Sequence, residues 1–162
     1  MGRTGGTPAT VALLQAGVAH EMRPYDHDPG ASSYGLEAAR ALNVPPERVF
    51  KTLLAKVDGC LVVAVVPVSG SLDLKALAAA VGGKRAEMAE AAAAERATGY
   101  VVGGISPLGQ HKALPTVVDE TASSFETVLV SAGRRGLDVE LAPADLARLT
   151  GARLAPIGRP GG

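Results

Sequence analysis

Residues 49–68, VFKTLLAKVDGCLVVAVVPV, carry the pattern that decides the fold, and they predict a β-hairpin. Asp58 and Gly59 form a dipeptide that favours a two-residue turn between antiparallel strands. The second run, residues 60–68, is apolar on both of its faces, so we expect a central strand that other elements cover from both sides. In the first run, Lys51 is the single charged residue in a row of side chains that is otherwise apolar.

Lys51 has two interpretations when the pattern is taken alone. A lysine at the end of a strand can lay its aliphatic stem along the protein and carry its charge to water. Alternatively, Lys51 lies at the rim of a pocket, where its charge would orient a carbonyl or a phosphate. Thr52 faces the other way in a regular strand, so a β-bulge would be needed to bring both residues to one ligand.

The rest of the chain mixes helix and strand signals without strict alternation, and short turns join several of the strands. This mixture favours one α+β domain over residues 1–162, with a curved mixed β-sheet surrounded by helices. Residues 158–162, GRPGG, are expected to form a flexible tail. We expect helices at 8–16, 35–42, 70–82, 90–99 and 143–151, a helical turn at 45–49, a strand end at 100–102, and strands at 19–28, 49–57, 60–68, 85–89, 116–120, 126–132, 137–142 and 152–157.

Composition and charge narrow the class of protein. The chain has 162 residues, 47% hydrophobic and 20% charged, which favours a packed core over disorder. Sixteen basic and sixteen acidic residues give no net charge, which argues against a generic nucleic-acid binder. Cys60 is the one cysteine, so we expect neither a disulfide framework nor a cysteine zinc cluster, and a reducing cytoplasm. Neither a membrane-spanning run nor a signal peptide is expected.

No metal site, cofactor or protein nucleophile is predicted. His27 lies between Asp26 and Asp28, but in an extended chain its ring faces away from their carboxylates, which favours a solvated polar loop. Cys60 follows the hairpin turn at the head of a buried strand and is better explained as a small apolar residue than as a nucleophile. No serine lies in a nucleophile-elbow pattern.

Two further segments allow a structural and a functional interpretation. Gly103 and Gly104 follow a short apolar run and match neither a P-loop nor a dinucleotide fingerprint. They indicate either a turn with unusual dihedral angles or a backbone that a ligand approaches closely. Arg134 and Arg135 lie in a hairpin turn, where they are either solvated or, beside a cleft, able to hold phosphates.

Several blocks of the sequence together resemble one family. The blocks include TPA at 7–9, YDHDP at 25–29, VFKTLLA at 49–55, ERATGYVVGGISPLGQHKALPTVVDE at 95–120 and VSAGRRGLDVELAP at 130–143. They are similar to the YbaK-type proteins, free-standing relatives of the editing domain inserted in bacterial prolyl-tRNA synthetases. The resemblance runs from about Thr7 to Ile157, nearly the whole chain.

The resemblance implies a mixed sheet with surrounding helices and a cytoplasmic trans-editing aminoacyl-tRNA deacylase of hydrolase or lyase type. The implied substrate is cysteine mischarged onto tRNA(Pro), with Cys-tRNA(Cys) as a further candidate. The implied partners are the 3′ aminoacyl-adenosine end of the mischarged tRNA and, in a transient complex, prolyl-tRNA synthetase. No cofactor, metal or membrane is implied.

The resemblance also implies a set of eight site residues. In the family the substrate thiol attacks its own ester carbonyl and leaves as a thiolactone, so the protein orients the ester and stabilises the oxyanion. Relatives often carry phenylalanine at the position of Tyr34. The residues implied to be catalytic are Lys51, Gly103 and Asp138, and those implied to bind the substrate are Tyr25, Tyr34, Thr52, Gly104 and Ser131.

Three alternatives stay open at this point. A sister enzyme of the same superfamily would release alanine, serine or threonine from tRNA by means of a bound water. A non-catalytic aminoacyl-tRNA-binding partner of prolyl-tRNA synthetase would bind without turnover. A metal hydrolase would lose its activity in a chelator.

Overall fold

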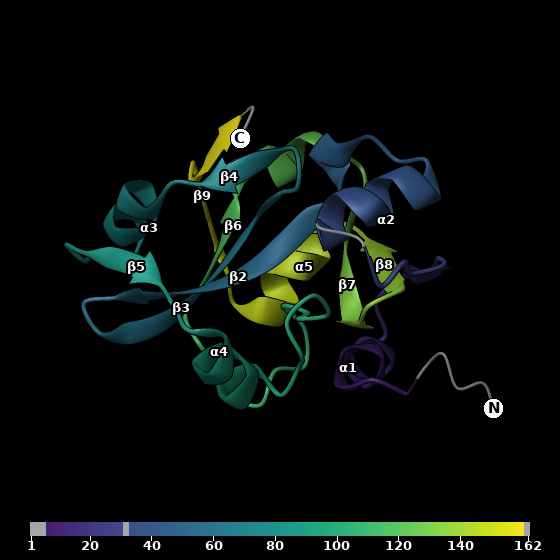
Figure 1. Ribbon diagram of the computed structural model, residues 1–162, viewed down its shortest axis with the longest axis horizontal. Helices are drawn as coiled ribbons and strands as arrows, with labels where there is room; N and C mark the ends of the chain where they lie inside the picture. The colour runs from purple at the N-terminus through teal and green to yellow at the C-terminus, as the bar shows by residue number, and fades with distance from the viewer. Residues whose placement is uncertain (1–5, 31–32, 161–162) are drawn as a thin grey trace.

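The computed structural model describes residues 6–30 and 33–160, and in them helices surround three β-sheets: a larger sheet of five strands, a smaller sheet of three strands and a two-stranded ribbon (Figure 1). The strands are β1 His20–Pro24, β2 Phe50–Val57, β3 Cys60–Pro67, β4 Gly70–Leu72, β5 Ala86–Met88, β6 Thr116–Asp119, β7 Val128–Arg134, β8 Leu137–Leu141, β9 Arg153–Ala155 and β10 Gly158–Pro160. The helices are α1 Pro8–Ala16, α2 Tyr34–Leu42, α3 Leu74–Ala80, α4 Ala91–Thr98 and α5 Pro143–Thr150, with short 3-10 turns η2 Pro46–Arg48 and η3 Glu120–Ser124.

The predicted hairpin forms the centre of the larger sheet, whose strand order is β5-β2-β3-β6-β9. The antiparallel register of β2 and β3 runs without interruption from Phe50 opposite Pro67 to Val57 opposite Cys60. Both residues of the intervening turn have positive φ, 50° at Asp58 and 85° at Gly59, as a type I′ turn requires. β3 pairs with β6 in parallel, and so does β6 with β9, so the mixed sheet of the predicted α+β fold is confirmed.

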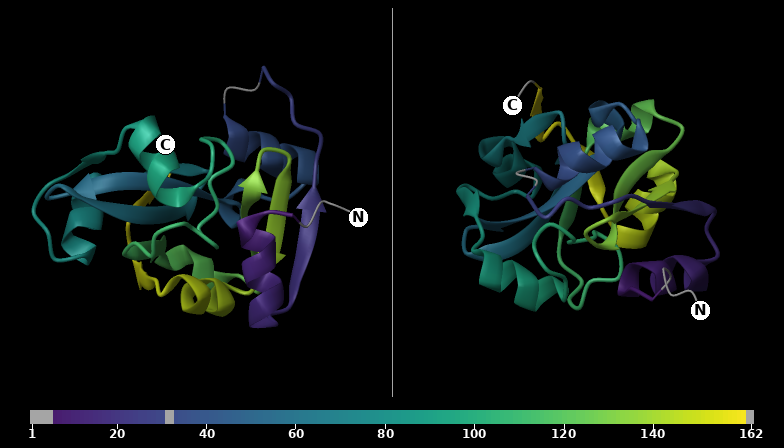
Figure 2. Two further views of the ribbon diagram at one scale, coloured as in Figure 1. Left: turned by 90° about the horizontal axis from the view of Figure 1, so that it is seen from below. Right: turned by 45° about the vertical axis from the view of Figure 1, so that its right-hand side comes forward.

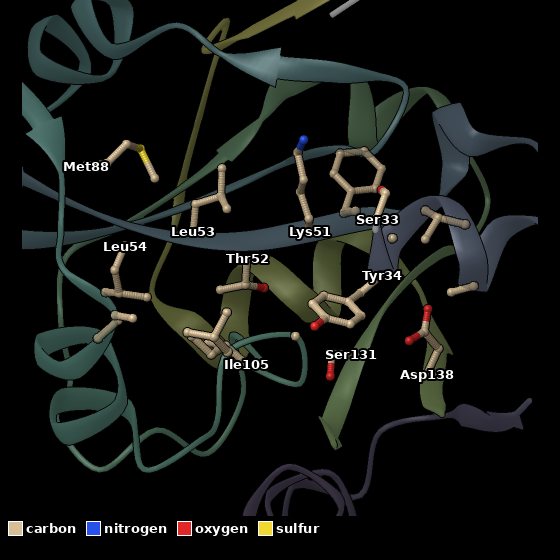
Figure 3. Close-up of a pocket in the computed structure, with 18 of the residues that line it drawn as sticks. Ser33, Tyr34, Lys51, Thr52, Leu53, Leu54, Met88, Ile105, Ser131 and Asp138 are labelled. Atoms are coloured by element: carbon tan, nitrogen blue, oxygen red, sulfur yellow. The ribbon is translucent and has the colours of Figure 1, made fainter. Parts of the chain in front are cut away.

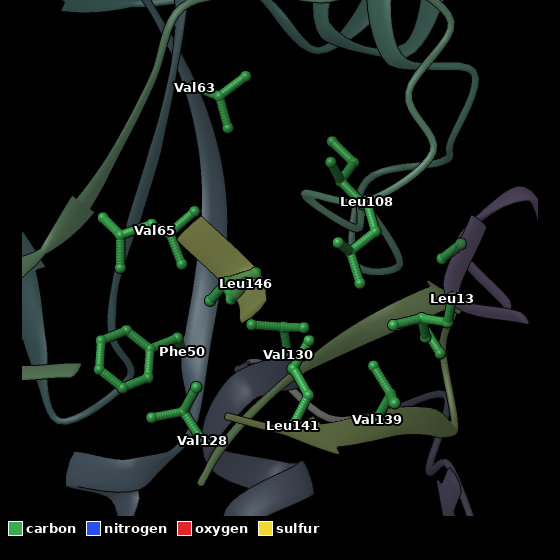
Figure 4. Close-up of a cluster of buried hydrophobic side chains, with 14 of the residues drawn as sticks. Leu13, Phe50, Val63, Val65, Leu108, Val128, Val130, Val139, Leu141 and Leu146 are labelled. Atoms are coloured by element: carbon green, nitrogen blue, oxygen red, sulfur yellow. The ribbon is translucent and has the colours of Figure 1, made fainter. Parts of the chain in front are cut away.

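Both faces of β3 are buried, as its apolar sequence predicts. Alternate side chains of β3 pack on one face against Leu77 of α3 and on the other into the core that reaches the smaller sheet. That smaller sheet has the order β1-β8-β7, so β1 is the predicted edge strand. Figure 4 shows the shared core, where Leu146 of α5 lies between Val65 of the larger sheet and Val130 of the smaller one. Figure 2 shows the larger and the smaller sheet from two further directions.

Three helices begin directly after capping residues that the sequence predicts. Thr7, Ser33 and Asp73 each accept a hydrogen bond from the backbone of the first turn of α1, α2 and α3. Each side chain satisfies one of the helix's first N–H groups, which otherwise have no intrahelical partner. None of the helices in the described part of the chain is long and apolar enough to span a membrane.

Two expected local structures differ from the observed ones. Residues 158–160 are not a tail but strand β10, antiparallel to β4, because the Asp119 carboxylate accepts hydrogen bonds from the Ile157 and Gly158 N–H groups at 3.0 and 2.8 Å. Gly161 and Gly162 lie outside the described residues. No strand ends at 100–102, because Tyr100 is buried and its hydroxyl donates to the Leu108 carbonyl, folding the segment into a loop.

Asp119→Ala is expected to lower the free energy of unfolding by about 3 kcal/mol, because it leaves buried N–H donors without an acceptor. The carboxylate also accepts from the Thr121 N–H and hydroxyl, so it joins β6, η3 and β10. Glu120→Ala is the matched control, since Glu120 is exposed, and should change the value by less than about 0.5 kcal/mol. Urea unfolding of both variants measures the difference, and equal stabilities would contradict this role.

Candidate functional site

A cavity of about 360 Å³ lies where strands β2 and β7 separate. An isolated parallel bridge joins Val49 to Leu129, immediately before β2 and at the start of β7. Beyond this bridge, β2 pairs only with β3 as far as Leu54, and β7 pairs with β8. The two strands therefore diverge, and the space between them is closed by the start of α2, the segment from β5 to α4, and the loop around Gly103 (Figure 3).

Lys51 and Thr52 both line this cavity without the β-bulge that the sequence analysis required. The register of β2 is regular, and Figure 3 shows the two side chains leaving the strand in opposite directions. The cavity reaches both because it lies against the unpaired edge of β2 and extends to either face. A bulge was the condition under which one ligand could reach both side chains. The cavity reaches both without a bulge, because it lies along the edge of β2 and not on one face of the sheet.

The two side chains differ in their partners. The Lys51 ammonium donates to the Gly70 carbonyl at 3.0 Å, and burial lowers the pKa of Lys51 below its usual value. One hydrogen bond leaves the ammonium with two further N–H donors. The Thr52 hydroxyl is buried and has no hydrogen-bond partner among the described residues. A buried hydroxyl without a hydrogen-bond partner destabilises the folded protein. A polar ligand that bonds to this hydroxyl would remove that cost.

Ser131 and Asp138 are cross-strand partners of β7 and β8 and lie on the same side of β2 as Thr52 (Figure 3). A register irregularity follows Ser131, before Arg134 pairs with Leu137. The Ser131 oxygen accepts from the Gly133 N–H at 3.1 Å, so its own hydroxyl hydrogen remains available to donate.

Asp138 is a buried carboxyl group that faces the cavity. Burial raises its pKa to about 7, and the nearby charge of Arg23 offsets part of that rise. Arg23 forms its ion pair with Glu140, which also binds Arg48, so no cation fully neutralises Asp138 in the described structure. A cationic ligand group beside Asp138 would lower its pKa and favour the carboxylate.

Two tyrosines form a wall of the cavity. Burial and, after it, the charge of Asp138 raise the pKa of Tyr25 to about 12, so the hydroxyl stays protonated. The Tyr34 ring, at the start of α2, carries the Arg135 guanidinium 4.5 Å from its centroid, and the His27 ring lies 5.8 Å from it. Tyr34 thus presents a ring held from two sides.

The glycine pair has a different role at each position. Gly103 lines the cavity with φ of +94°, and a Cβ there would meet the Tyr34 ring and Arg135 within 3 Å. Gly104 does not line the cavity; a Cβ there would meet the Arg134 backbone at 2.7 Å, and its N–H donates to the Val101 carbonyl. Gly104 is therefore explained by close packing.

The remaining candidates have structural partners. Arg135 donates to the Val102 carbonyl and so holds the Gly103 loop to the β7–β8 turn, which occupies the guanidinium. His27 pairs with Glu37 at 2.8 Å, and no cluster of three metal-ligating side chains occurs in residues 6–30 and 33–160. Cys60 is exposed beside the turn, not buried as expected, because the strand becomes covered only further along.

The apolar part of the cavity was missed by the sequence analysis. Met88, Ile105, and Ala91 and Ala94 of α4 line it together with Leu54. Periodicity marks such residues as core, and nothing in their sequence distinguishes a cavity wall from a packed interior. Ser33 also lines the cavity and was identified only as a helix cap.

Comparison with known proteins matches residues 28–149 to the aminoacyl-tRNA editing domain. This chain belongs to that family. The family comprises aminoacyl-tRNA deacylases of the YbaK type, so the resemblance drawn from the sequence blocks is confirmed. All eight predicted site positions except Tyr25 fall within the matched range.

Two curated relatives and one solved structure show how similar this chain is to known proteins. A protein of Enterococcus faecalis named "Putative Cys-tRNA(Pro)/Cys-tRNA(Cys) deacylase EbsC" is 42% identical over 120 residues, 74% of this chain and 73% of that protein. The "Multifunctional Ser/Thr-tRNA deacylase ProXp-y" of Escherichia coli K12 is 34% identical over 104 residues, 61% of this chain and 62% of that protein. The "Crystal structure of a putative trans-editing enzyme for prolyl tRNA synthetase" has a TM-score of 0.84 at 23% identity, over 98% of this chain and 99% of that one, which shows the fold.

Asp138→Asn is expected to stabilise the protein at pH 8 by roughly 2–4 kcal/mol and to have little effect near pH 4. The folded-state pKa of Asp138 is about 7 and the usual value is 3.8, so ionising the buried acid destabilises the fold progressively as pH rises between these values. Asparagine does not ionise. Urea unfolding at both pH values measures the change.

Glu140→Gln serves as the control of opposite sign. The hydrogen bond from the Thr127 hydroxyl, followed by the two arginines, holds the pKa of Glu140 below its usual value, so its loss should destabilise the protein at pH 8. An Asp138→Asn variant less stable than the wild type at pH 8 would contradict the account of this buried acid.

Proposed function

We propose that this editing domain removes cysteine from mischarged tRNA(Pro), with the substrate thiol as the nucleophile. One observation carries the proposal: the described residues that line the cavity supply a lysine, a carboxyl group and hydroxyls, but neither a cysteine nor a histidine that could activate a serine. The attacking group then has to come from the substrate or from water. The E. faecalis relative, named for Cys-tRNA deacylation, supports cysteine as the substrate.

The residues take roles that follow from charge and position. The Asp138 carboxylate holds the α-ammonium of the aminoacyl group, because it is buried beside Ser131 without a full cationic partner. Lys51, on the opposite face of β2, binds the terminal phosphate or ribose of the tRNA through the N–H donors that Gly70 does not occupy. We assign the N–H of Gly103, which lines the cavity, to the ester carbonyl, where it can stabilise an oxyanion.

The chemical step needs no group that the protein and the substrate do not supply. The substrate sulfur forms a bond to the ester carbonyl carbon, and the carbonyl oxygen becomes an oxyanion. The bond from that carbon to the ribose oxygen then breaks, releasing a cyclic thiolactone, and the thiol proton ends on the ribose oxygen. Intramolecular attack of this kind is worth roughly 7–11 kcal/mol in favourable cases.

Release of serine or threonine by a bound water is the second candidate, because the E. coli relative is named for Ser/Thr-tRNA deacylation. Under that alternative, Thr52 and Ser131 would position the water, and the volume of the cavity would set the amino acid. The apolar walls formed by Met88 and Ile105 favour the thiol of a cysteine substrate over the hydroxyl of a serine or threonine substrate.

A panel of mischarged tRNAs separates the two candidates. The wild-type protein is expected to release cysteine from Cys-tRNA(Pro) at least about tenfold faster than serine from Ser-tRNA(Pro), because the less nucleophilic serine hydroxyl cannot replace the thiol. Equal release of both would contradict thiol attack, and binding without any release would contradict deacylation. Adding prolyl-tRNA synthetase should raise the rate if the two proteins form a transient complex.

Lys51→Ala is expected to lower kcat/KM for Cys-tRNA(Pro) by about 100-fold, as the loss of a charged donor at a reacting group does. Lys56→Ala is the matched control, because Lys56 lies on the same strand outside the cavity. The control should retain the wild-type rate. A Lys51→Ala variant as active as Lys56→Ala would refute the role of Lys51.

A further inference from the structure

The unpaired edge of β2 is part of the cavity wall. All six residues from Val49 to Leu54 line the cavity, although their side chains alternate between the two faces of the sheet. A continuous run of this kind contacts the cavity through its backbone as well as through its side chains. β5 pairs with β2 only from Ala55 to Val57, and the Ala89 N–H then bonds the Leu54 carbonyl, so the edge is open before that point.

The turn determines which backbone groups face this edge. A two-residue turn makes Val57 and Cys60 a hydrogen-bonded pair, so odd-numbered residues of β2 direct their N–H and C=O groups to β3 and even-numbered residues direct theirs away from it. Two observed hydrogen bonds agree with this alternation. The carbonyl of odd-numbered Val49 accepts from the Val68 N–H on the β3 side, and the carbonyl of even-numbered Leu54 accepts from the Ala89 N–H on the opposite side.

The Phe50 carbonyl and the Thr52 N–H are therefore directed at the cavity. Neither takes part in a backbone hydrogen bond outside the sheet pairings within residues 6–30 and 33–160. The Thr52 hydroxyl beside them is buried and has no hydrogen-bond partner among the described residues. Buried backbone groups are almost always paired in folded proteins, so an acceptor and a donor side by side at an open edge indicate a place for a ligand.

We propose that this edge binds the adenine base of the terminal nucleotide through the backbone, the Phe50 carbonyl accepting from the N6 amino group and the Thr52 N–H donating to the adjacent ring nitrogen. The inference rests on the proposed function, which brings an aminoacyl-adenosine into the cavity. Adenine is the part of that substrate that has a hydrogen-bond donor and an acceptor side by side on one planar edge. The carbonyl and N–H of a strand edge can pair with these two groups as they would pair with a neighbouring strand. Leu53 on the Lys51 side of β2 and the Tyr34 ring on the Thr52 side offer apolar walls for its two faces.

The position agrees with the other assigned groups. Lys51 lies next to this backbone pair on the upper face of β2 in Figure 3, on the side assigned to the phosphate or ribose. Ser131 and Asp138 lie across the cavity, on the side assigned to the amino acid. Main-chain groups thus recognise the base. These groups stay the same whichever side chains occupy positions 50 and 52.

Binding of a non-hydrolysable 3′-amide-linked aminoacyl-adenosine, measured by calorimetry against its purine counterpart lacking N6, tests the proposal without turnover. The wild type should bind the purine analogue about tenfold more weakly, since one hydrogen bond is lost and a backbone carbonyl stays unpaired. Either the 1-deaza or the 7-deaza analogue should show a similar loss and so identify the ring nitrogen. Equal affinities across this series, or no binding of the adenosine analogue, would overturn the proposal.

Two variants at Thr52 test the backbone. Thr52→Pro removes the N–H, and an edge position whose N–H leaves the sheet is one where proline is tolerated. It should abolish the discrimination between the adenine and the ring-nitrogen analogue, whereas Thr52→Val, which keeps the N–H, should retain it. Loss of discrimination in Thr52→Val alone would assign recognition to the hydroxyl and overturn the backbone role. If Thr52→Pro does not fold, the analogue series on the wild type decides.

If the wild type releases no amino acid from any mischarged tRNA while the analogue series behaves as expected, the proposed function fails and the base site stands. If release occurs but the analogue series shows no discrimination, only the base site fails.

Discussion

The separation of β2 from β7 beyond the Val49–Leu129 bridge is the constraint on which the site depends. Two strands that begin side by side and then pair with different neighbours leave a wedge that their own side chains do not fill. The uninterrupted β2–β3 pairing holds one side of the wedge, and the β7–β8 pairing holds the other. Lys51, Thr52, Ser131 and Asp138 therefore lie on paired strands, whereas Tyr34 begins α2 and the loop around Gly103 closes the cavity.

The polar groups of the wedge are separated by the sheet itself. Lys51 on one face and Thr52 on the other are consecutive residues, so a ligand that touches both has to cross the strand edge (Figure 3). Asp138, buried and with a raised pKa, lies at the far side and favours a positive ligand group. One end of the cavity thus carries a cation, Lys51, and the other end a carboxyl group, Asp138. These two groups fix the direction in which an aminoacyl-nucleotide lies.

Much of the fold could be predicted from the sequence, because the signals are local. Asp58-Gly59 determines the hairpin, the apolar run of β3 determines its central place, and Thr7 and Ser33 begin their helices as expected. The strand at 158–160 could not be predicted, because its pairing depends on Asp119, some forty residues away in the chain. That the whole chain forms one domain stays a prediction.

The site was predictable only in part. Resemblance indicated Lys51, Asp138 and the glycine pair, but only the tertiary structure shows that Gly104 packs against Arg134 and that an open strand edge forms a wall. Edges arise from pairing between distant segments, which no local pattern contains.

Mapping of backbone amide shifts by NMR on addition of the amide-linked aminoacyl-adenosine tests the central claim most directly. The account predicts that shifts gather at Thr52, Gly103 and Asp138, around the wedge between β2 and β7. Shifts gathered instead around Thr121 and Arg159, which line a second cavity of about 350 Å³, with none in the wedge, would contradict it.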